Sequence, residues 1–431
     1  MKYRFPAIAA SLLVLAACFS VEGPAPVSDV VDPVFTIAVI PDTQNYVDYT
    51  HQTADGFPFD ASELFLQQMR YISENLESEG GDIAFVTSVG DVWQHQTLEM
   101  DPEHEALGFR RVANPVLDAH FAPTPKVLAV EIPVVREGFA MIAGKVPFGV
   151  APGNHDHDAM WTDSNHPPAE VVRSAADVGM LHAGGLSNFK SVFSDQSDYF
   201  RGQPWYVAAH DDGASSAQLF SAGGREFLHI SLVFAPMDDT LEWAEQVMAS
   251  YPGVPTLITT HEYINNDGER LANPVIDQHA VDARHNTPEM LWEKFISQND
   301  QIFLVICGHH HGQAYRVDPN AFGNQVHQVL ADYQDRHQTA IDAGATVQQG
   351  LGIGDGWMRL MEFDFSEETP VIRVRTYSTH YNVESSDLET YADWYKAAEE
   401  PDLSNEAFLA EEDFVVELTD FHARFSKGEQ R

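Results

Sequence analysis

Residues 146–156 read VPFGVAPGNHD, and this stretch carries the pattern that decides the fold. An apolar run from Val146 to Ala151 ends in the polar turn GNHD at 153–156. Short apolar runs that stop at a polar turn are typical of buried β-strands. The stretch therefore predicts a strand that carries polar side chains at its carboxyl end.

The same event recurs at four other places along the chain. Apolar runs lead from 34–41 into Asp42, from 83–89 into Gly90-Asp91, from 255–260 into His261, and from 302–307 into Gly308-His309-His310-His311. Between these runs the sequence predicts helices at 60–77, 103–121, 238–250 and 287–299, the last with Thr287 as its N-cap. Strands that alternate with helices indicate a layered α/β core, and such sheets place their sites at the carboxyl ends of the strands.

The remaining segments decorate this core. Further strands are predicted at 225–234 and 325–331. A hairpin is predicted from two more strands, at 357–365 and 371–378. Residues 157–224 lack a clear period and are interpreted as an insertion near the site. The tail at 384–431 is acidic, but Phe414, Leu418, Phe421 and Phe425 recur at helical spacing. We therefore expect a C-terminal helix that packs on the body.

The polar groups at the strand ends form a ligand set for metal ions. They are Asp42, Asp91, Asn154, His261, His309 and His311. Each type alone is an ordinary turn or cap residue. Together, carboxylate, amide and imidazole groups suit divalent first-row metals, and one bridging carboxylate would allow two neighbouring ions. The joint placement therefore predicts a metal centre.

In their order, these motifs resemble those of the calcineurin-like metallophosphoesterase superfamily. Its signature reads D-x-H, G-D-x-x-[DN], G-N-H-[DE], a single His and G-H-x-H, and the resemblance covers about residues 34–312. The resemblance implies a four-layer α/β/β/α sandwich for the domain at 34–383. It also implies hydrolysis of phosphate esters assisted by two divalent metal ions, drawn from Mn, Zn, Fe or Ca.

The resemblance also assigns residues to roles. Asp42, Gln44, Asp91 and His311 are expected at one metal, and Asp91, Asn154, His261 and His309 at the other, so that Asp91 bridges the two. His155 is not a ligand in this scheme. We expect it to protonate the leaving alkoxide, with Asp156 fixing its tautomer.

Two positions depart from the family pattern. Gln44 stands where the family usually has a ligand histidine, and Gln94 stands where the second motif often ends in an acidic or amide residue. An amide oxygen is a harder and weaker donor than imidazole. The sequence PDTQ at 41–44 resembles the first motif of an exported bacterial subgroup of this superfamily that has glutamine at the fourth position. This resemblance favours a functional metal site in which glutamine replaces the histidine. Reduced metal occupancy is the alternative.

The N-terminus predicts export. Residues 1–18 contain Lys2 and Arg4, an apolar run, and the sequence LAAC at 15–18, which resembles a lipobox that would lipidate Cys18. An ordinary signal peptide with a chance cysteine is the alternative. Residues 19–33 have the composition of a tether. We therefore expect a protein anchored to the bacterial cell envelope, at the outer membrane or in the periplasm, with membrane contact through the lipid only.

The charge balance limits the partners. The formal net charge is −41, from 65 acidic and 24 basic residues, and such a field repels nucleic acid. An anionic substrate then needs local positive charge, which bound metal ions supply. The expected partner is a small phosphorylated substrate.

These observations predict an extracytoplasmic phosphomonoesterase, since export fits phosphate scavenging. A phosphodiesterase using the same site is one alternative. A metal-binding surface lipoprotein without turnover is another, suggested by Gln44 and the anchor. An enzyme acting on a substrate without phosphate is a third, because a fold does not fix a function.

Overall fold

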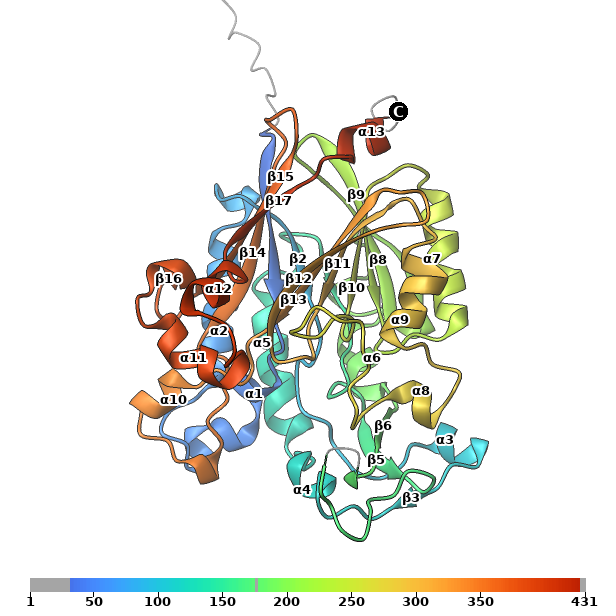
Figure 1. Ribbon diagram of the computed structural model, residues 1–431, viewed down its shortest axis with the longest axis vertical. Helices are drawn as coiled ribbons and strands as arrows, with labels where there is room; N and C mark the ends of the chain where they lie inside the picture. Colours follow the sequence, from blue (N-terminus) through green and yellow to red (C-terminus); the bar gives the residue numbers. More distant parts are fainter. Residues whose placement is uncertain (1–31, 175–176, 427–431) are drawn as a thin grey trace, which may run out of the picture. The chain divides into compact units, whose positions relative to one another are not determined.

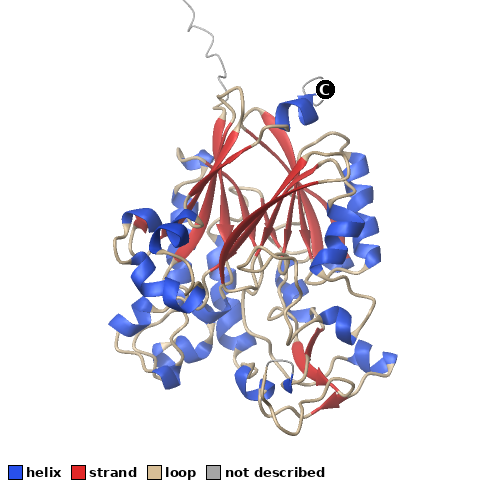
Figure 2. Cartoon of the chain, in the orientation of Figure 1, coloured by secondary structure: helices blue, strands red, loops and turns tan. Residues whose placement is uncertain are grey.

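The computed structural model describes residues 32–174 and 177–426. The predicted signal peptide, the lipidation site Cys18 and nearly all of the predicted tether therefore lie outside the described residues. Within those ranges, none of the helices has the length and apolarity needed to cross a membrane. The fold is mixed α/β, with two large sheets and helices outside them (Figures 1 and 2).

The first sheet has seven strands. Its order is β16-β15-β14-β1-β2-β4, and β17 pairs with β15. The strands are β1 (Val34–Ile40), β2 (Ile83–Ser88), β4 (Phe148–Val150), β14 (Trp357–Asp364), β15 (Val371–Ser378), β16 (Val383–Glu384) and β17 (Phe414–Glu417). β1, β2 and β4 are parallel, whereas β14 pairs with β1 and β15 in antiparallel fashion. The predicted 357–378 hairpin is thus confirmed.

The second sheet also has seven strands, in the order β12-β13-β11-β10-β9-β8-β7. They are β7 (Tyr206–His210), β8 (Ser215–Ala222), β9 (Arg225–Leu232), β10 (Thr256–Thr260), β11 (Ile302–Cys307), β12 (Gly312–Pro319) and β13 (Gln325–Asp332). The four central strands, β9, β10, β11 and β13, are parallel. Their carboxyl ends therefore meet at one edge of the sheet.

Aromatic side chains join the inner faces of the two sheets. Phe35 of β1 stacks on Phe363 of β14 with ring centroids 4.9 Å apart, and lies 5.4 Å from Phe227 of β9. Alternate residues of β1 face the other way, and Ala38 and Ile40 pack in a separate buried cluster with helical side chains. β1 is therefore buried on both faces, which explains its unbroken apolar sequence.

Helices cover the outer faces of both sheets (Figure 1). α2 (Ser62–Glu74) and α5 (Ile132–Ala140) share a buried cluster with β1 and β2. α7 (Asp238–Ser250) and α9 (Pro288–Leu291) share another with β9, β10 and β11. The remaining helices are α1 (Gln44–Val47), α3 (Pro102–Leu107), α4 (Leu117–His120), α6 (Ser187–Phe193), α8 (Gln278–Val281), α10 (Gln338–Asp342), α11 (Tyr391–Glu399), α12 (Asn405–Ala410) and α13 (Phe421–Phe425).

The helix predicted at 103–121 is wrong. α3 ends at Gly108, whose φ of +96° is the left-handed conformation that terminates helices. A short strand, β3 (Arg111–Val112), follows and pairs with β5 (Ala159–Asp163), which in turn pairs with β6 (Leu181–Gly184). The sequence pattern therefore hid a small three-stranded sheet. The predicted insertion at 157–224 supplies β5 and β6, but its last strands, β7 and β8, belong to the second large sheet.

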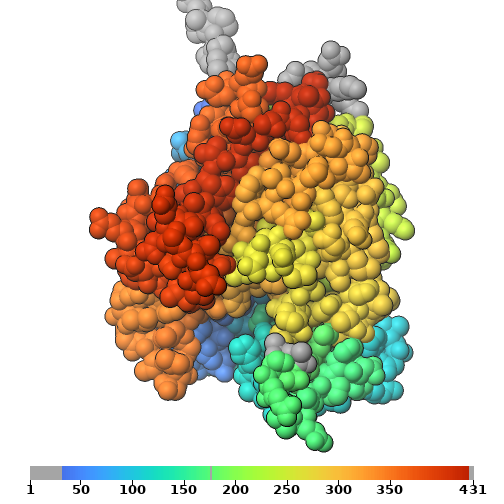
Figure 3. Space-filling view, viewed as in Figure 1, coloured from blue at the N-terminus to red at the C-terminus, as the bar shows by residue number. Residues whose placement is uncertain are grey.

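The expected C-terminal helix is found only in part, as α13, whose Phe421 and Phe425 are buried in the core. β17 pairs with β15, so Phe414 begins a strand, and only the last turns at 421–425 are helical. α11 and α12 precede them, and Figure 3 shows these C-terminal segments as red atoms beside orange ones. β15 has three antiparallel partners, β14, β16 and β17, and the backbone pairing of β17 with β15 outweighs the helical spacing of its apolar residues.

Candidate metal centre

The carboxyl ends of five strands bring their polar residues together as predicted. β1, β2 and β4 in one sheet lead into Asp42, Asp91 and Asn154, and β10 and β11 in the other lead into His261 and His309. Ligand atoms of Asp42, Asp91 and His261 all lie within 4.8 Å of one another. The two sheets therefore contribute to one buried cluster that has the composition of a divalent metal site.

His261 stands at the middle of the cluster. Its Nδ1 lies 2.9 Å from the Val89 carbonyl oxygen, which fixes the proton on Nδ1 and leaves the Nε2 lone pair free. That Nε2 lies 2.9 Å from Asn154 Oδ1, 3.4 Å from Asp91 Oδ2 and 4.0 Å from Asp42 Oδ2. An electron pair that faces three oxygen atoms calls for a proton or a cation between them.

The second histidine of the cluster repeats this situation. His309 Nδ1 lies 3.1 Å from His261 Nε2, so two imidazole nitrogens face each other. His309 Nε2 is buried without a hydrogen-bond partner and lies 3.5 Å from Glu262 Oε1. Asp42 Oδ1 is also buried and unpartnered. Buried polar atoms without partners are rare in native proteins, and here they form a donor set that suits a cation.

The buried carboxylates of the cluster also favour a positive charge between them. Burial, together with the Asp332 carboxylate, raises the pKa of Asp42 well above its usual value, and His261 only partly opposes this. Burial lowers the pKa of His261, but Asp91 and Asp42 outweigh it and raise the pKa to about 10. Buried carboxylates that hold a proton on a neighbouring imidazole would hold a divalent ion in its place. The residues present therefore fit a metal.

Gly153 and Gly308 of the motifs have no room for a side chain, because the predicted ligand carboxylates pack against their Cα atoms. A Cβ on Gly153 would lie 2.2 Å from Asp91 Oδ1, and one on Gly308 would lie 2.1 Å from Asp42 Oδ1. Asp91 and His309 themselves adopt positive φ values of 49° and 71°. Such conformations are uncommon for residues other than glycine and gather at functional sites.

Gln44 belongs to a chain of side chains beside the cluster. Its Nε2 donates to Asp91 Oδ2 at 3.2 Å and to Gln334 Oε1. The Gln334 amide contacts His311 Nε2, and His311 Nδ1 lies 2.5 Å from Asp335 Oδ2. Gln44 Oε1 is buried without a partner. Gln44 therefore contacts the shared carboxylate, while its direct ligation stays a prediction.

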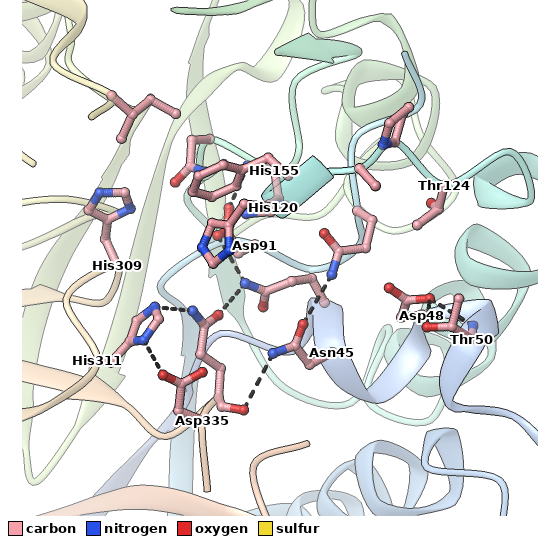
Figure 4. Close-up of a pocket in the computed structure, with 18 of the residues that line it drawn as sticks. Asn45, Asp48, Thr50, Asp91, His120, Thr124, His155, His309, His311 and Asp335 are labelled. Atoms are coloured by element: carbon pink, nitrogen blue, oxygen red, sulfur yellow. Dashed lines mark hydrogen bonds and ion pairs between the residues drawn. The ribbon is translucent and has the colours of Figure 1, made fainter. Parts of the chain in front are cut away.

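His311 and His155 border the cluster from the side of a cavity. This cavity has a volume of about 550 Å³ and is lined by Asp91, His155, His309 and His311, among others (Figure 4). His155 packs between the rings of His95 and Phe121, at 5.7 and 5.9 Å, and its Nδ1 has no partner. Burial lowers its pKa. A free imidazole thus stands at the wall of a space large enough for a small ligand.

The predicted role of Asp156 is wrong. Its two oxygens accept hydrogen bonds from the backbone N–H groups of Val92 at 2.9 Å and Gly153 at 2.7 Å. Burial and the charge of Asp91 raise its pKa to about 8. Asp156 therefore ties together two motif turns whose donors would otherwise be unsatisfied, and it does not orient His155.

Four residues of the site escaped sequence reasoning. Glu262 follows His261, and Asp332, Gln334 and Asp335 lie at the end of β13. β13 is the parallel neighbour of β11, so its carboxyl end reaches the same edge of the sheet. The strand-end rule applied to 325–331 would have found the last three residues.

The described residues that line the cavity include no lysine or arginine, whereas Asp48, Asp91 and Asp335 are among them. Without bound cations, an anion entering this space meets carboxylates. An anionic ligand therefore requires metal ions or protonated imidazoles.

Comparison with known proteins supplies no activity for this centre. No protein-family model matches the chain. A protein of Bacillus subtilis (strain 168) described as "Uncharacterized protein YvnB" is 24% identical over 245 residues. The match covers 55% of this chain and 16% of that protein, so the chain spans only a small part of the length of this relative.

Proposed function

We propose that the protein is a metal-dependent hydrolase of phosphate esters with a metallophosphoesterase fold. Two facing sheets with helices on their outer faces are consistent with a four-layer α/β/β/α sandwich. The observation that carries the proposal is the meeting of Asp42, Asp91, Asn154, His261 and His309 from five strand ends. Their order along the chain and their spatial convergence agree with the motif resemblance.

Two divalent ions bound here would supply the charge that neutralises phosphoryl oxygens and activates water. Asp42, Asp91, Asn154, His261 and His309 would hold them, with His311 at the cavity side. The carbonyl of Val89 and the carboxylate of Asp335 fix the rings of His261 and His311. Protein groups therefore orient both of these rings for ligation.

His155 has the position of a proton donor. It stands at the cavity wall, beside Asp91, whose Oδ1 accepts a hydrogen bond from the His155 backbone N–H at 2.8 Å. The adjacent rings of His95 and Phe121 restrict its motion. We infer that His155 protonates the leaving alkoxide.

One observation favours a phosphodiester as the second candidate substrate class. The cavity carries Asp48 and Asp335, and no lysine or arginine among its described lining residues. These carboxylates oppose the second negative charge of a monoester dianion more than the single charge of a diester. The expected monoester therefore competes with a diester at the same site.

The test uses purified protein loaded separately with manganese, zinc, iron or calcium. Turnover is measured on alkyl and nitrophenyl phosphates, as monoesters and as diesters. His155→Asn should lower turnover about 10²- to 10⁴-fold on alkyl esters and much less on nitrophenyl esters, because a nitrophenolate leaves without a proton. Metal content should stay unchanged in this variant.

His380→Asn is the matched control, because His380 is exposed and is not among the described residues lining the cavity. It should behave as the wild type. Metal binding without hydrolysis of any ester would support the alternative of a surface lipoprotein without turnover. Equal losses on both leaving groups would show that His155 positions the phosphate instead of donating a proton.

A further inference from the structure

A second group of histidines lies apart from the metal centre. His104 on α3, His182 on β6, and Asp282 and His285 after α8 place one ligand atom each within 4.8 Å of one another. None of the four belongs to the motifs at the strand ends. They connect α3 and the small three-stranded sheet with the segment after α8, which lies between His261 and His309 in the sequence.

The imidazole nitrogens of this group lack partners. His104 Nε2, His285 Nε2 and both ring nitrogens of His182 are buried without a hydrogen bond. The exposed fractions are 6% for His104 and 0% for His182. Packing alone explains one such ring in a core, but three rings with free nitrogens turned toward one another require a shared partner.

Neighbouring groups orient these rings for ligation. His104 Nδ1 lies 2.8 Å from Asp101 Oδ2, and His285 Nδ1 lies 2.7 Å from the Ala235 carbonyl oxygen. Each contact fixes the proton on Nδ1 and turns the Nε2 lone pair toward the other members of the group. A carboxylate or carbonyl behind a ligand histidine is the usual support of a metal site.

The fourth member supplies the negative charge. Asp282 is 6% exposed, and its Oδ2 lies 3.9 Å from His104 Nε2. Arg284 holds this carboxylate through a hydrogen bond of 2.8 Å from its Nε. The ring centroids of His104 and His182 are 4.4 Å apart, and those of His182 and His285 are 5.5 Å apart.

We propose that His104, His182, Asp282 and His285 bind a structural zinc ion. Three imidazole nitrogens and one carboxylate oxygen complete a tetrahedral shell and leave no open position, which is the mark of a structural zinc site. Ligand atoms around tetrahedral zinc are about 3.3 Å apart, so shifts of about 1 Å close the present set.

The ion would fasten one wall of the cavity described above. Leu181, next to His182, donates its backbone N–H to the Val275 carbonyl oxygen at 2.8 Å. Val275 and Ile276 line that cavity. Zinc bound between β6 and the 282–285 segment would therefore hold Val275 and Ile276 from two sides: through the hydrogen bond with Leu181 of β6, and through the chain that leads from Ile276 to Asp282.

The experiment measures zinc per chain in the full protein after growth with zinc and extensive dialysis. His182→Asn should lose one equivalent and keep the ions of the first centre, whereas Asp91→Asn should keep this equivalent. The His380→Asn control should match the wild type. Chelation should lower the melting temperature of Asp91→Asn but not that of the double variant Asp91→Asn/His182→Asn.

A second measurement applies even if His182→Asn fails to fold. Cobalt loaded into Asp91→Asn should give the intense visible absorption of four-coordinate cobalt, and Asp282→Asn in the same background should weaken it. The proposal is overturned if the folded His182→Asn variant retains wild-type zinc, or if the Asp91→Asn protein shows no such absorption.

Discussion

Substitution of Gly153 by alanine tests whether backbone approach builds the first metal centre. The added Cβ would lie 2.2 Å from Asp91 Oδ1, 2.6 Å from His261 Cε1 and 2.7 Å from the Asp91 backbone nitrogen. Gly153 does not have a left-handed φ, so alanine is allowed by the backbone and the effect is steric alone. Because carbon and oxygen atoms do not approach so closely, Asp91 must move by about 1 Å.

That movement has two measurable results. Overpacking typically costs about 1–3 kcal/mol, and the hydrogen bonds of Asp91 to Gln44 and His155 are lost in addition. We expect the free energy of unfolding of the metal-free protein to fall by about 3 kcal/mol. Displacement of the shared carboxylate should weaken metal binding by at least about tenfold.

Urea unfolding followed by tryptophan fluorescence measures the first result, and metal analysis after dialysis measures the second. Gly253→Ala is the control, because Gly253 has a φ of +79° and no atom near its added Cβ. It should cost about 1–2 kcal/mol through its left-handed backbone and leave metal content unchanged. Wild-type metal affinity in Gly153→Ala would refute the reasoning.

Five further substitutions, which make four predictions, have defined outcomes. Asp91→Asn should remove both ions of the first centre and His261→Ala mainly one, because Asp91 belongs to both predicted ligand sets; equal losses in metal analysis would contradict the bridge. If Gln44 acts through Asp91, Gln44→Ala should change turnover and its pH profile more than it changes metal content. A larger change in metal content than in turnover would indicate that Gln44 is a direct ligand. Burial and Asp48 raise the pKa of Glu131 from 4.5 to about 8, so its burial costs stability progressively as the pH rises through this window. The free energy of unfolding of Glu131→Gln, relative to that of the wild type, should therefore be higher at pH 8 than at pH 4.5, by about 1.4 kcal/mol for each pH unit by which the pKa is raised. Urea unfolding that gives the same difference between variant and wild type at both pH values would contradict this. Cys18→Ser should move the protein from the membrane fraction to the soluble exported fraction, and unchanged fractionation would show that Cys18 is not the anchor.

Sequence patterns predicted the elements that are buried on both faces. Short runs without charged residues, rich in apolar and β-branched side chains, gave β1, β2, β10 and β11, because strands buried on both faces have no solvent-exposed face that could blur the pattern. α7 agrees with its predicted range of 238–250. The polar ends of these strands therefore located the ligand set as well.

Partly exposed elements were not predictable in this way. The strand β17 was read as helix because its partner β15 is far away in sequence. The sequence shows that the tail is acidic, but it does not show that Glu399 and Glu412 pair with the buried Arg336, at 2.9 and 2.6 Å. Pairing of a buried charge depends on tertiary contacts, which composition does not encode.

The charge distribution of the folded chain connects these results with the chemistry of the site. The chain carries a net charge of −41, and buried cations such as Arg336 and Arg359 are committed to Glu412, away from the cavity lining. Among the described residues that line the cavity, the only ionisable side chains besides Tyr49 are carboxylates and imidazoles. Under the proposed function, positive charge for a phosphate must come from bound cations, which Asp91 and the imidazoles would hold, while Asp48 and Asp335 oppose the anion. If the proposed function holds, metal occupancy controls both the chemistry and the entry of substrate, so metal-free protein should bind phosphate esters as poorly as its net charge implies.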